Sequence, residues 1–394
     1  MRIATEDHVM FKECISAFRG KGYQYDDLNE NVNNLKGYLL LDFELKERWE
    51  FDFFAIEPTQ RVFFQGSYQA FIAPVIMFNS EGYYNAHSFT IALSAIFSFI
   101  TGRTIKAPRD SEYLRYSELG RELDSGMIAR LGLGFPVQTA GVGSCNPQLS
   151  SKIIDEYYVD LKEIINILLE LPDKTYRQVM QAIRLIQLSY MTKRDDFGLA
   201  YYLLISAIES VAQKAITKKS MKEKDPLEEE WAQLTKKNPQ IEELLQAYKK
   251  EKNKNNYLKQ RFVKFIYTYC PPEHWENMKH QYEDVASYIS ELRGDNDYDI
   301  PKKLWSEKYP SDLNTEQIDK ILADLYKHRS KYTHEGMDPP HRLPNSNNKF
   351  FDELLFENTN DMDGIPSKLV VPSYRLIGFI AKNSILNYVR EKCC

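Results

Sequence analysis

The sequence lacks the hallmarks of several protein classes. It opens MRIATEDHVMFKE, with acidic residues where a signal peptide requires an apolar run. The longest apolar stretch, residues 86–100, contains Ser and Thr and is too short to span a bilayer. With only 17 glycines and 17 prolines in 394 residues, the chain is neither collagen-like nor of low complexity. We therefore expect a soluble cytoplasmic protein without membrane contact.

Cysteine is scarce, and no C-x-x-C pair occurs. The five cysteines are Cys14, Cys145, Cys270, Cys393 and Cys394. An odd, scattered set fits a reducing compartment and offers neither a disulfide framework nor a zinc site. His274 and His280 have glutamates nearby, but their spacing of six places them on different faces of a helix, and H-E-x-x-H is absent. The sequence therefore predicts no metal and no cofactor.

Motifs for nucleotide binding and acyl transfer are also missing. The chain has no P-loop, no G-x-G-x-x-G that opens a helix and no G-x-S-x-G elbow. Residues 120–144 hold many glycines, which we interpret as turns. The net charge of −5 disfavours a general polyanion binder but leaves room for a local basic patch.

The length suits two domains, and the pattern changes near residue 150. The first part, residues 1–150, predicts a small α+β domain. Aromatic and branched residues alternate with polar connectors there, which is typical of strands and turns. We expect strands over residues 37–45, 49–56, 61–65, 68–78 and 104–107, and a helix over 87–100.

From residue 151 the apolar residues recur every three or four positions, which predicts a mainly α fold. The clearest case is residues 200–215, where Leu204, Ile208 and Val211 lie on one stripe. We expect a helical bundle over residues 151–394. Its further helices are expected over 151–171, 176–191, 257–268, 272–292 and 374–392.

Residues 214–264 form a lysine-rich insert. They contain 14 Lys plus Arg against 8 Asp plus Glu, a net charge of +6, so the rest of the chain carries −11. Such a run is typical of a solvated helix surface. The alternative is a contact with an RNA backbone, where fixed positive charge releases counterions.

The segment before RSKYTHEG predicts a well-bounded helix. Asn314 with Gln317 resembles a capping box, and Gly336 supplies a C-terminal stop. An apolar stripe that includes Leu325 continues to Arg329 and then Tyr332. An arginine at a packing position must be paired or must line a solvated cleft, because an unpaired buried charge is very costly.

The spacing Arg329-x4-His334 resembles the motif of HEPN domains. The segments LLISAIESVAQ and YRLIGFIAKNSILNYVREK strengthen the resemblance, which covers residues 151–394 and is closest to the Apea-like branch. The resemblance implies a dimeric helical bundle with metal-independent endoribonuclease activity. It assigns catalysis to Arg329 and His334, with support from Glu209. Ser330 departs from the Asn, Asp or His often found there, and residues 337–368 are an insertion before the last helix.

These residue types suit RNA cleavage. RNA carries its own nucleophile, the 2′-OH, so the reaction needs proton transfer and charge stabilisation. Histidine can serve as general acid or base, and the arginine fork matches phosphate oxygens. We expect His334 to move the proton and Arg329 to stabilise the transition state, leaving a 2′,3′-cyclic phosphate or a 3′-phosphate. Ser330 and Tyr332 are expected to support them, and the backbone of the RNA is expected to contact Lys327, His328 and Lys331.

On an ideal helix Arg329 and His334 point about 140° apart. A composite site in a homodimer or a higher even oligomer would allow Arg329 of one chain and His334 of another to act together.

The resemblance further implies a toxin or antiviral defence effector, gated by the N-terminal domain through an unknown trigger. The alternative is a catalytically silent bundle for dimerisation or partner binding, in which Glu209 and Arg329 form a buried ion pair. A DNA-binding regulator is disfavoured, because no short helix-turn-helix with a basic recognition helix occurs.

Overall fold

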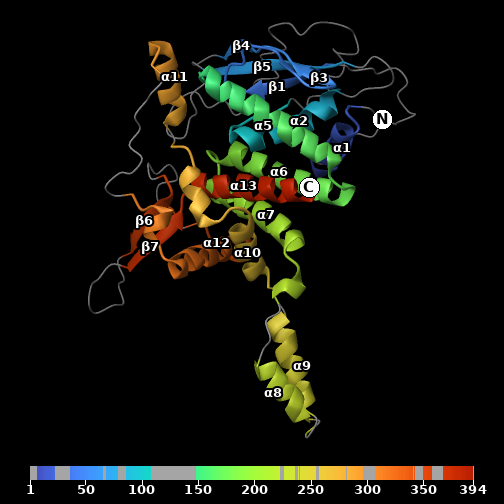
Figure 1. Cartoon of the computed structure of the whole chain (residues 1–394), viewed down its shortest axis with the longest axis vertical. Helices are drawn as coiled ribbons and strands as arrows, with labels where there is room; N and C mark the ends of the chain where they lie inside the picture. Colours follow the sequence, from blue (N-terminus) through green and yellow to red (C-terminus); the bar gives the residue numbers. More distant parts are fainter. Residues whose placement is uncertain are drawn as a thin grey trace.

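A computed structural model describes residues 7–22, 36–64, 68–78, 86–107, 148–221, 226–235, 238, 240–253, 257–280, 282–295, 307–339, 341, 349–356 and 367–393. This part of the chain is mainly helical, with a small strand region near the N-terminus (Figure 1). The α-helices are α1 (Asp7–Arg19), α2 (Ala86–Thr101), α5 (Ser151–Glu170), α6 (Asp173–Thr192), α7 (Phe197–Ala215), α8 (Pro226–Thr235), α9 (Gln240–Asn253), α10 (Leu258–Tyr269), α11 (Glu283–Arg293), α12 (Thr315–Glu335) and α13 (Tyr374–Cys393). Short 3-10 helices are η1 (Lys218–Met221), η2 (Pro272–Asn277) and η3 (Pro310–Asp312).

The strands form an N-terminal antiparallel sheet and a separate hairpin. They are β1 (Lys36–Leu41), β2 (Trp49–Glu50), β3 (Phe54–Ile56), β4 (Gln60–Phe64), β5 (Tyr68–Met77), β6 (Phe351–Phe356) and β7 (Ser367–Pro372). The long β5 is central in the order β1-β5-β3-β2, and β4 also pairs with β5. In Figure 1 this sheet is the upper layer and most of the helices lie below it. The hairpin of β6 and β7 lies in a part of the chain where no strand was predicted.

Helix α2 is buried on nearly all sides between the sheet and helices α5 and α6. Its polar side chains are satisfied locally: the Thr90 and Ser94 hydroxyls donate to the carbonyls of Ala86 and Ile91. Gly37 of β1 lies so close to α2 that a Cβ there would overlap Thr90. Burial therefore accounts for the apolar run at 86–100. Within the described residues, no helix is both long and apolar enough to cross a membrane.

One hydrophobic core runs through both parts of the chain. It extends from Phe11 of α1 through Phe97 of α2 and Leu204 of α7 to Val389 of α13. The sheet and the helical part are therefore packed on each other, and α2 contacts strands of the sheet as well as helices α5 and α6. The division of the chain into domains at residue 150 stays a prediction.

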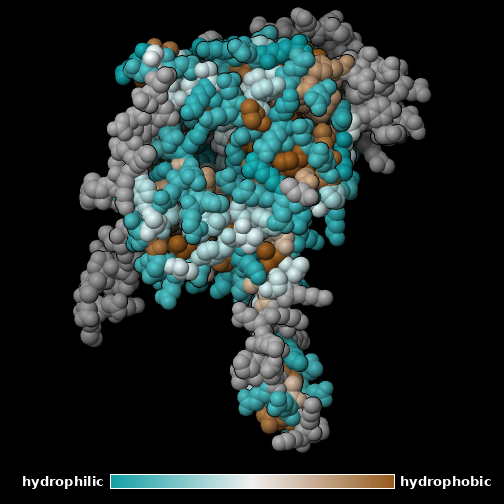
Figure 2. Space-filling model, viewed as in Figure 1, coloured by the Kyte–Doolittle hydropathy of each residue, from teal (hydrophilic) through white to brown (hydrophobic). Residues whose placement is uncertain are grey.

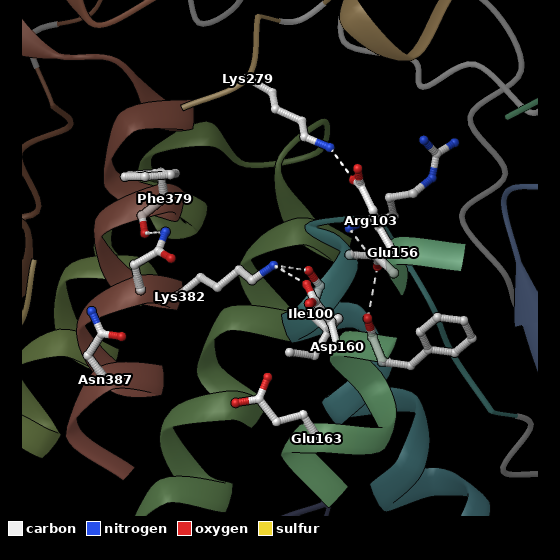
Figure 3. Close-up of polar contacts among 12 residues, drawn as sticks. Ile100, Arg103, Glu156, Asp160, Glu163, Lys279, Phe379, Lys382 and Asn387 are labelled. Atoms are coloured by element: carbon white, nitrogen blue, oxygen red, sulfur yellow. Dashed lines mark hydrogen bonds and ion pairs between the residues drawn. The ribbon is translucent and has the colours of Figure 1, made fainter. Parts of the chain in front are cut away.

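A polar seam joins α5 to α13 and to the segment after η2 (Figure 3). Glu163 accepts two hydrogen bonds from Arg390 at 2.7 and 2.9 Å. Glu156 contacts the ammonium of Lys279 (Figure 3). Lys382 of α13 approaches Asp160 at 3.7 Å and also donates to the carbonyl of Ile100 in the last turn of α2. Burial lowers the pKa of Lys382. Lys382 thus ties the helix under the sheet to the C-terminal helix.

Most of the predicted elements are present within a few residues, but three predictions are wrong. The strand predicted over 49–56 is instead the two short strands β2 and β3, which pair antiparallel, and residues 104–107 contribute only an isolated bridge between Lys106 and Leu40. The single helix predicted over 272–292 is interrupted. The 3-10 helix η2 and the α-helix α11 are separated by Met278–Tyr282. The backbone becomes extended at Met278 (φ −62°, ψ 125°), which ends η2, while Trp275 is fully buried and donates its indole N–H to the carbonyl of Cys270. Residues 120–144, interpreted as glycine turns, lie outside the described residues.

The lysine-rich insert contains a helical arm. Helices α8 and α9 pack on each other and project away from the body of the molecule (Figure 1). Trp231 and Tyr248 form an aromatic pair between them at 5.3 Å. Leu234 and Leu244 stay exposed, and hydrophobic atoms are visible on the arm in Figure 2.

Candidate functional site

Helix α12 has the boundaries that its capping residues predict. The Asn314 side chain accepts a hydrogen bond from the Gln317 N–H at 2.8 Å, and Gln317 accepts one from the Asn314 N–H at 3.0 Å. The helix ends at Gly336, whose φ of 64° is left-handed. The apolar stripe is buried up to Leu325, as predicted. The last three turns, which carry the candidate residues, leave the core and run beside α7.

Arg329 contacts Glu209 of α7. Its Nε atom lies 2.9 Å from Glu209 Oε2. The Arg329 side chain is 23% exposed, whereas that of Glu209 is 5% exposed. The Nε atom itself is buried, and its N–H is not directed at a hydrogen-bond acceptor. The contact is therefore an ion pair by proximity, with part of the arginine side chain still open to solvent.

Two neighbours fix the carboxylate of Glu209. Its Oε1 accepts hydrogen bonds from the Gln213 side chain at 2.9 Å and from the Tyr326 hydroxyl at 3.2 Å. Burial, reinforced by the charge of Glu209, raises the pKa of Tyr326 to about 12. The tyrosine thus stays a donor at neutral pH. Glu209 is held from three directions, which in turn limits where Arg329 can lie.

An aromatic pair borders the arginine. The rings of Tyr202 and Tyr332 stack at 5.1 Å with 28° between their planes, and the guanidinium carbon of Arg329 lies 5.6 Å from the centre of the Tyr202 ring. Both tyrosines are half-buried. Tyr332 therefore supports Arg329 indirectly, by packing on the ring that the guanidinium faces.

His334 lies apart from this cluster. It is exposed in the last turn of α12, where its imidazole can also interact with the helix dipole. No hydrogen bond or ion pair between His334 and Arg329 is found within the described residues, although both side chains are described. A separation of five residues corresponds to about 7.5 Å along an ideal helix. One chain therefore does not bring the two predicted catalytic side chains together.

The remaining predicted residues surround the arginine unevenly. Lys327 is exposed, whereas Ser330 and Lys331 are half-buried. His328 is half-buried as well, and burial lowers its pKa, with Lys331 and Lys327 acting in the same direction. At neutral pH the His328 imidazole is thus mainly uncharged. Of the three predicted RNA-contacting residues, only the two lysines offer a full positive charge.

A narrow crevice separates the two helices at this point. Its volume of about 10 Å³ leaves room for roughly one water molecule. Lining residues come from α7, from α12 and from the chain after α12: Gly198, Tyr201, Tyr202, Ile205, His328, Arg329, Tyr332 and Pro339. The crevice is too small for a nucleotide, so an RNA strand would have to lie across its mouth.

Sequence reasoning missed a buried histidine beside the site. The His341 side chain is 1% exposed, with Nε2 at 3.2 Å from the carbonyl of Pro372 and 3.6 Å from Asp352 Oδ2. Tyr201 donates its hydroxyl to the same carbonyl at 3.0 Å. Burial lowers the pKa of His341 to about 4. These partners are distant in the sequence and belong to the β6–β7 hairpin and α7, so no local pattern could have revealed them.

The other histidine cluster considered does not assemble. His274 is exposed on η2, while the backbone N–H of His280 donates to the carboxylate of Glu283. Among the described residues no group of three or more His, Cys, Asp or Glu side chains is arranged to hold a metal ion.

Comparison of the chain with known protein families, with curated proteins and with solved structures finds no match. The HEPN resemblance therefore continues to rest on the motif of α12 and on its partner helices.

Proposed function

We propose that this protein is a metal-independent endoribonuclease of the HEPN type, with Arg329 and His334 as its catalytic residues. One observation carries the proposal. Glu209 holds the Arg329 side chain at 2.9 Å while 23% of that side chain remains exposed. A guanidinium that is held in place and still reaches solvent can accept a phosphate with little loss of conformational freedom.

The chemistry requires no further reactant. The 2′-oxygen of the RNA attacks the adjacent phosphorus, and the bond from phosphorus to the 5′-oxygen breaks. His334 transfers the proton that leaves the 2′-OH or the proton that reaches the 5′-oxygen, and Arg329 stabilises the charge on the phosphoryl oxygens. The products are a 2′,3′-cyclic phosphate and a 5′-OH.

The separation of the two side chains favours a site built from two chains. His334 and Arg329 point about 140° apart on an ideal helix. A second α12 placed against the first would bring His334 of one chain to Arg329 of the other. The active form is thus a homodimer or a higher even oligomer.

A gating role for the N-terminal part fits the packing. Because α2 contacts both the sheet and the helices α5 and α6, a change in the sheet can reach the helical part through one buried element. A toxin or antiviral defence effector requires such control, since unregulated RNA cleavage damages the host. Expression of the wild-type chain is expected to slow growth, and expression of His334→Ala is not.

The catalytically silent bundle is the second candidate, favoured by the ion pair itself. If Arg329 serves only to neutralise Glu209, Arg329→Ala leaves a buried carboxylate without its counter-charge. The free energy of unfolding should then fall by about 3 kcal/mol, while His334→Ala changes it by less than about 0.5 kcal/mol. In that case the purified protein cleaves no RNA.

Cleavage of end-labelled single-stranded RNA by the purified full-length chain, with and without EDTA, tests the proposal. We expect fragments that end in a cyclic phosphate or 3′-phosphate and carry a 5′-OH, at a rate that EDTA leaves unchanged. Loss of cleavage in EDTA, or fragments with a 5′-phosphate, would contradict the mechanism.

A further inference from the structure

The two oxygens of the Glu209 carboxylate have different partners. Oε1 accepts hydrogen bonds from the Tyr326 hydroxyl at 3.2 Å and from the Gln213 side chain at 2.9 Å, whereas Oε2 lies 2.9 Å from Nε of Arg329. Within the described residues, Tyr326 and Gln213 are the only donors to Oε1. A free carboxylate can instead accept two parallel hydrogen bonds from one guanidinium. Here one oxygen is already held by other donors.

Another pair in the same chain shows what an arginine does with a glutamate that has no other donor. Arg390 donates from Nε and Nη2 to the two oxygens of Glu163, at 2.7 and 2.9 Å. No further side chain of the described part of the chain donates to Glu163. The guanidinium therefore engages both oxygens and commits two of its nitrogens to the pair.

The terminal nitrogens of Arg329 are not committed in this way. Its Nε is buried, but Nη1 and Nη2 are not, and neither donates to an acceptor among the described residues. They lie on the side chain that is 23% exposed. Nη1 and Nη2 form the planar fork that matches two phosphate oxygens. A two-sided pair with Glu209, like that of Arg390 with Glu163, would engage one of them and break up the fork.

We infer that Tyr326 is a positioning residue for RNA cleavage: its hydroxyl keeps Glu209 on one side of the guanidinium and so leaves the fork of Arg329 free for the scissile phosphate. This role rests on the proposed function. The last torsion of a glutamate side chain turns easily, so the carboxylate needs a fixed donor to stay in one orientation.

Tyr326 is better placed than Gln213 to be that donor. It lies on α12 one turn before Arg329, and its ring packs on Phe262 of α10 at 5.6 Å between ring centres. Gln213 lies on α7 together with Glu209, and its flexible side chain can follow the carboxylate when it turns. The Tyr326 hydroxyl is thus the donor that links the carboxylate to the helix of the arginine.

Chemical modification tests the state of the fork without relying on RNA cleavage. Phenylglyoxal forms its adduct with the two terminal nitrogens of an arginine, and peptide mass spectrometry of the full-length chain measures the rate at Arg329. In Tyr326→Phe this rate should fall at least about tenfold, because one terminal nitrogen becomes engaged by Glu209. Exposed Arg293 of α11 is the internal reference and should react equally in both proteins.

Tyr267→Phe is the matched control. Tyr267 of α10 also donates its hydroxyl to a carboxylate of α12, that of Asp319 at 2.8 Å, but Asp319 lies near the start of the helix and away from Arg329. The control should keep the wild-type modification rate and the wild-type cleavage rate. Circular dichroism and urea unfolding check that both tyrosine variants fold.

Cleavage of single-stranded RNA tests the role in the reaction. The value of kcat/KM should fall at least about tenfold in Tyr326→Phe. When Glu209→Gln is already present, Tyr326→Phe should cause no further loss, because a neutral amide does not draw the guanidinium into a two-sided ion pair. A tyrosine that only stabilises the fold would cause the same loss in both backgrounds.

The outcomes separate this role from the nuclease activity itself. An unchanged modification rate at Arg329 in Tyr326→Phe would overturn the inference. So would an active wild type whose cleavage is unaffected by Tyr326→Phe, or a loss that persists in Glu209→Gln. If modification slows as expected but the wild type cleaves no RNA, the nuclease proposal fails, while the effect of Tyr326 on the fork stands.

Discussion

At the scale of single residues, Arg329 and His341 differ in how far the sequence could indicate their contacts in the folded chain. Arg329 was recognised because an arginine interrupted an apolar stripe, and its partner Glu209 came from the resemblance. His341 gave no such signal, because the Pro372 carbonyl that its ring contacts and the Tyr201 ring that packs on it are brought to it only by the folded chain. Local patterns identify a residue at an unusual position, but they do not identify the long-range contacts that determine its protonation.

His341 makes the stability of the fold depend on pH. Its folded-state pKa of about 4 lies below the value of 6.5 for an unperturbed histidine, because burial disfavours the charged ring. The unfolded chain therefore binds a proton first as pH falls, and the stabilisation present above pH 6.5 is lost between about 6.5 and 4. The loss amounts to at most about 3 kcal/mol.

Urea unfolding at pH 7.5 and pH 4.5 measures this effect. The difference in unfolding free energy between the two pH values should be smaller in His341→Gln than in the wild type. Exposed His274→Gln is the control and should follow the wild type. Equal pH dependence in all three proteins would show that His341 is protonated alike in the folded and unfolded chains.

At the scale of elements, helix ends with local caps were predictable and tertiary breaks were not. Asn314 and Gly336 bound α12 as expected, since a cap involves residues only a few positions apart. The break between η2 and α11 lies at Met278, whose extended backbone the periodicity of residues 272–292 could not indicate. The orientation of α11 was missed for the same reason: the spacing of its apolar residues identifies a helix but does not tell that they are exposed.

The end of α12 can be perturbed with a close control. Gly336 and Gly294 both end helices with positive φ, at 64° and 72°, and a Cβ at either would meet no atom within 4 Å. Replacing either by Ala should therefore lower the unfolding free energy by about 1 kcal/mol through backbone strain alone. Only Gly336→Ala should also slow RNA cleavage, because it disturbs the turn that carries His334. An equal cleavage rate in both variants would contradict a role for that turn.

At the scale of the whole molecule, charge is unevenly distributed. The chain carries −5 overall, yet residues 214–264 carry +6. The projecting part of the arm, residues 226–253, has five Lys and six Glu and is nearly neutral. The positive charge therefore lies at the base of the arm, where Lys214, Lys259 and Lys264 are exposed. Neither the net charge of the whole chain nor that of the insert indicates that the positive charge is concentrated at the base of the arm.

RNA affinity should thus depend on salt through the base of the arm. The slope of log affinity against log salt concentration should become less steep by about 0.7 for each contacting lysine that is neutralised. We expect Lys259→Gln with Lys264→Gln to reduce the slope, measured by fluorescence anisotropy with His334→Ala protein to prevent cleavage. Replacing residues 226–253 with a short Gly-Ser linker should leave it unchanged. The reverse pattern would assign the RNA contact to the arm.

The central claim is that His334 moves a proton during metal-free RNA cleavage, and the cleavage rate in EDTA tests it most directly. His334→Ala should fold as the wild type does and lose at least about 10²-fold in rate. His274→Ala, which removes an exposed histidine elsewhere, should retain the wild-type rate. If His334→Ala cleaves RNA as fast as His274→Ala, the catalytic assignment is wrong.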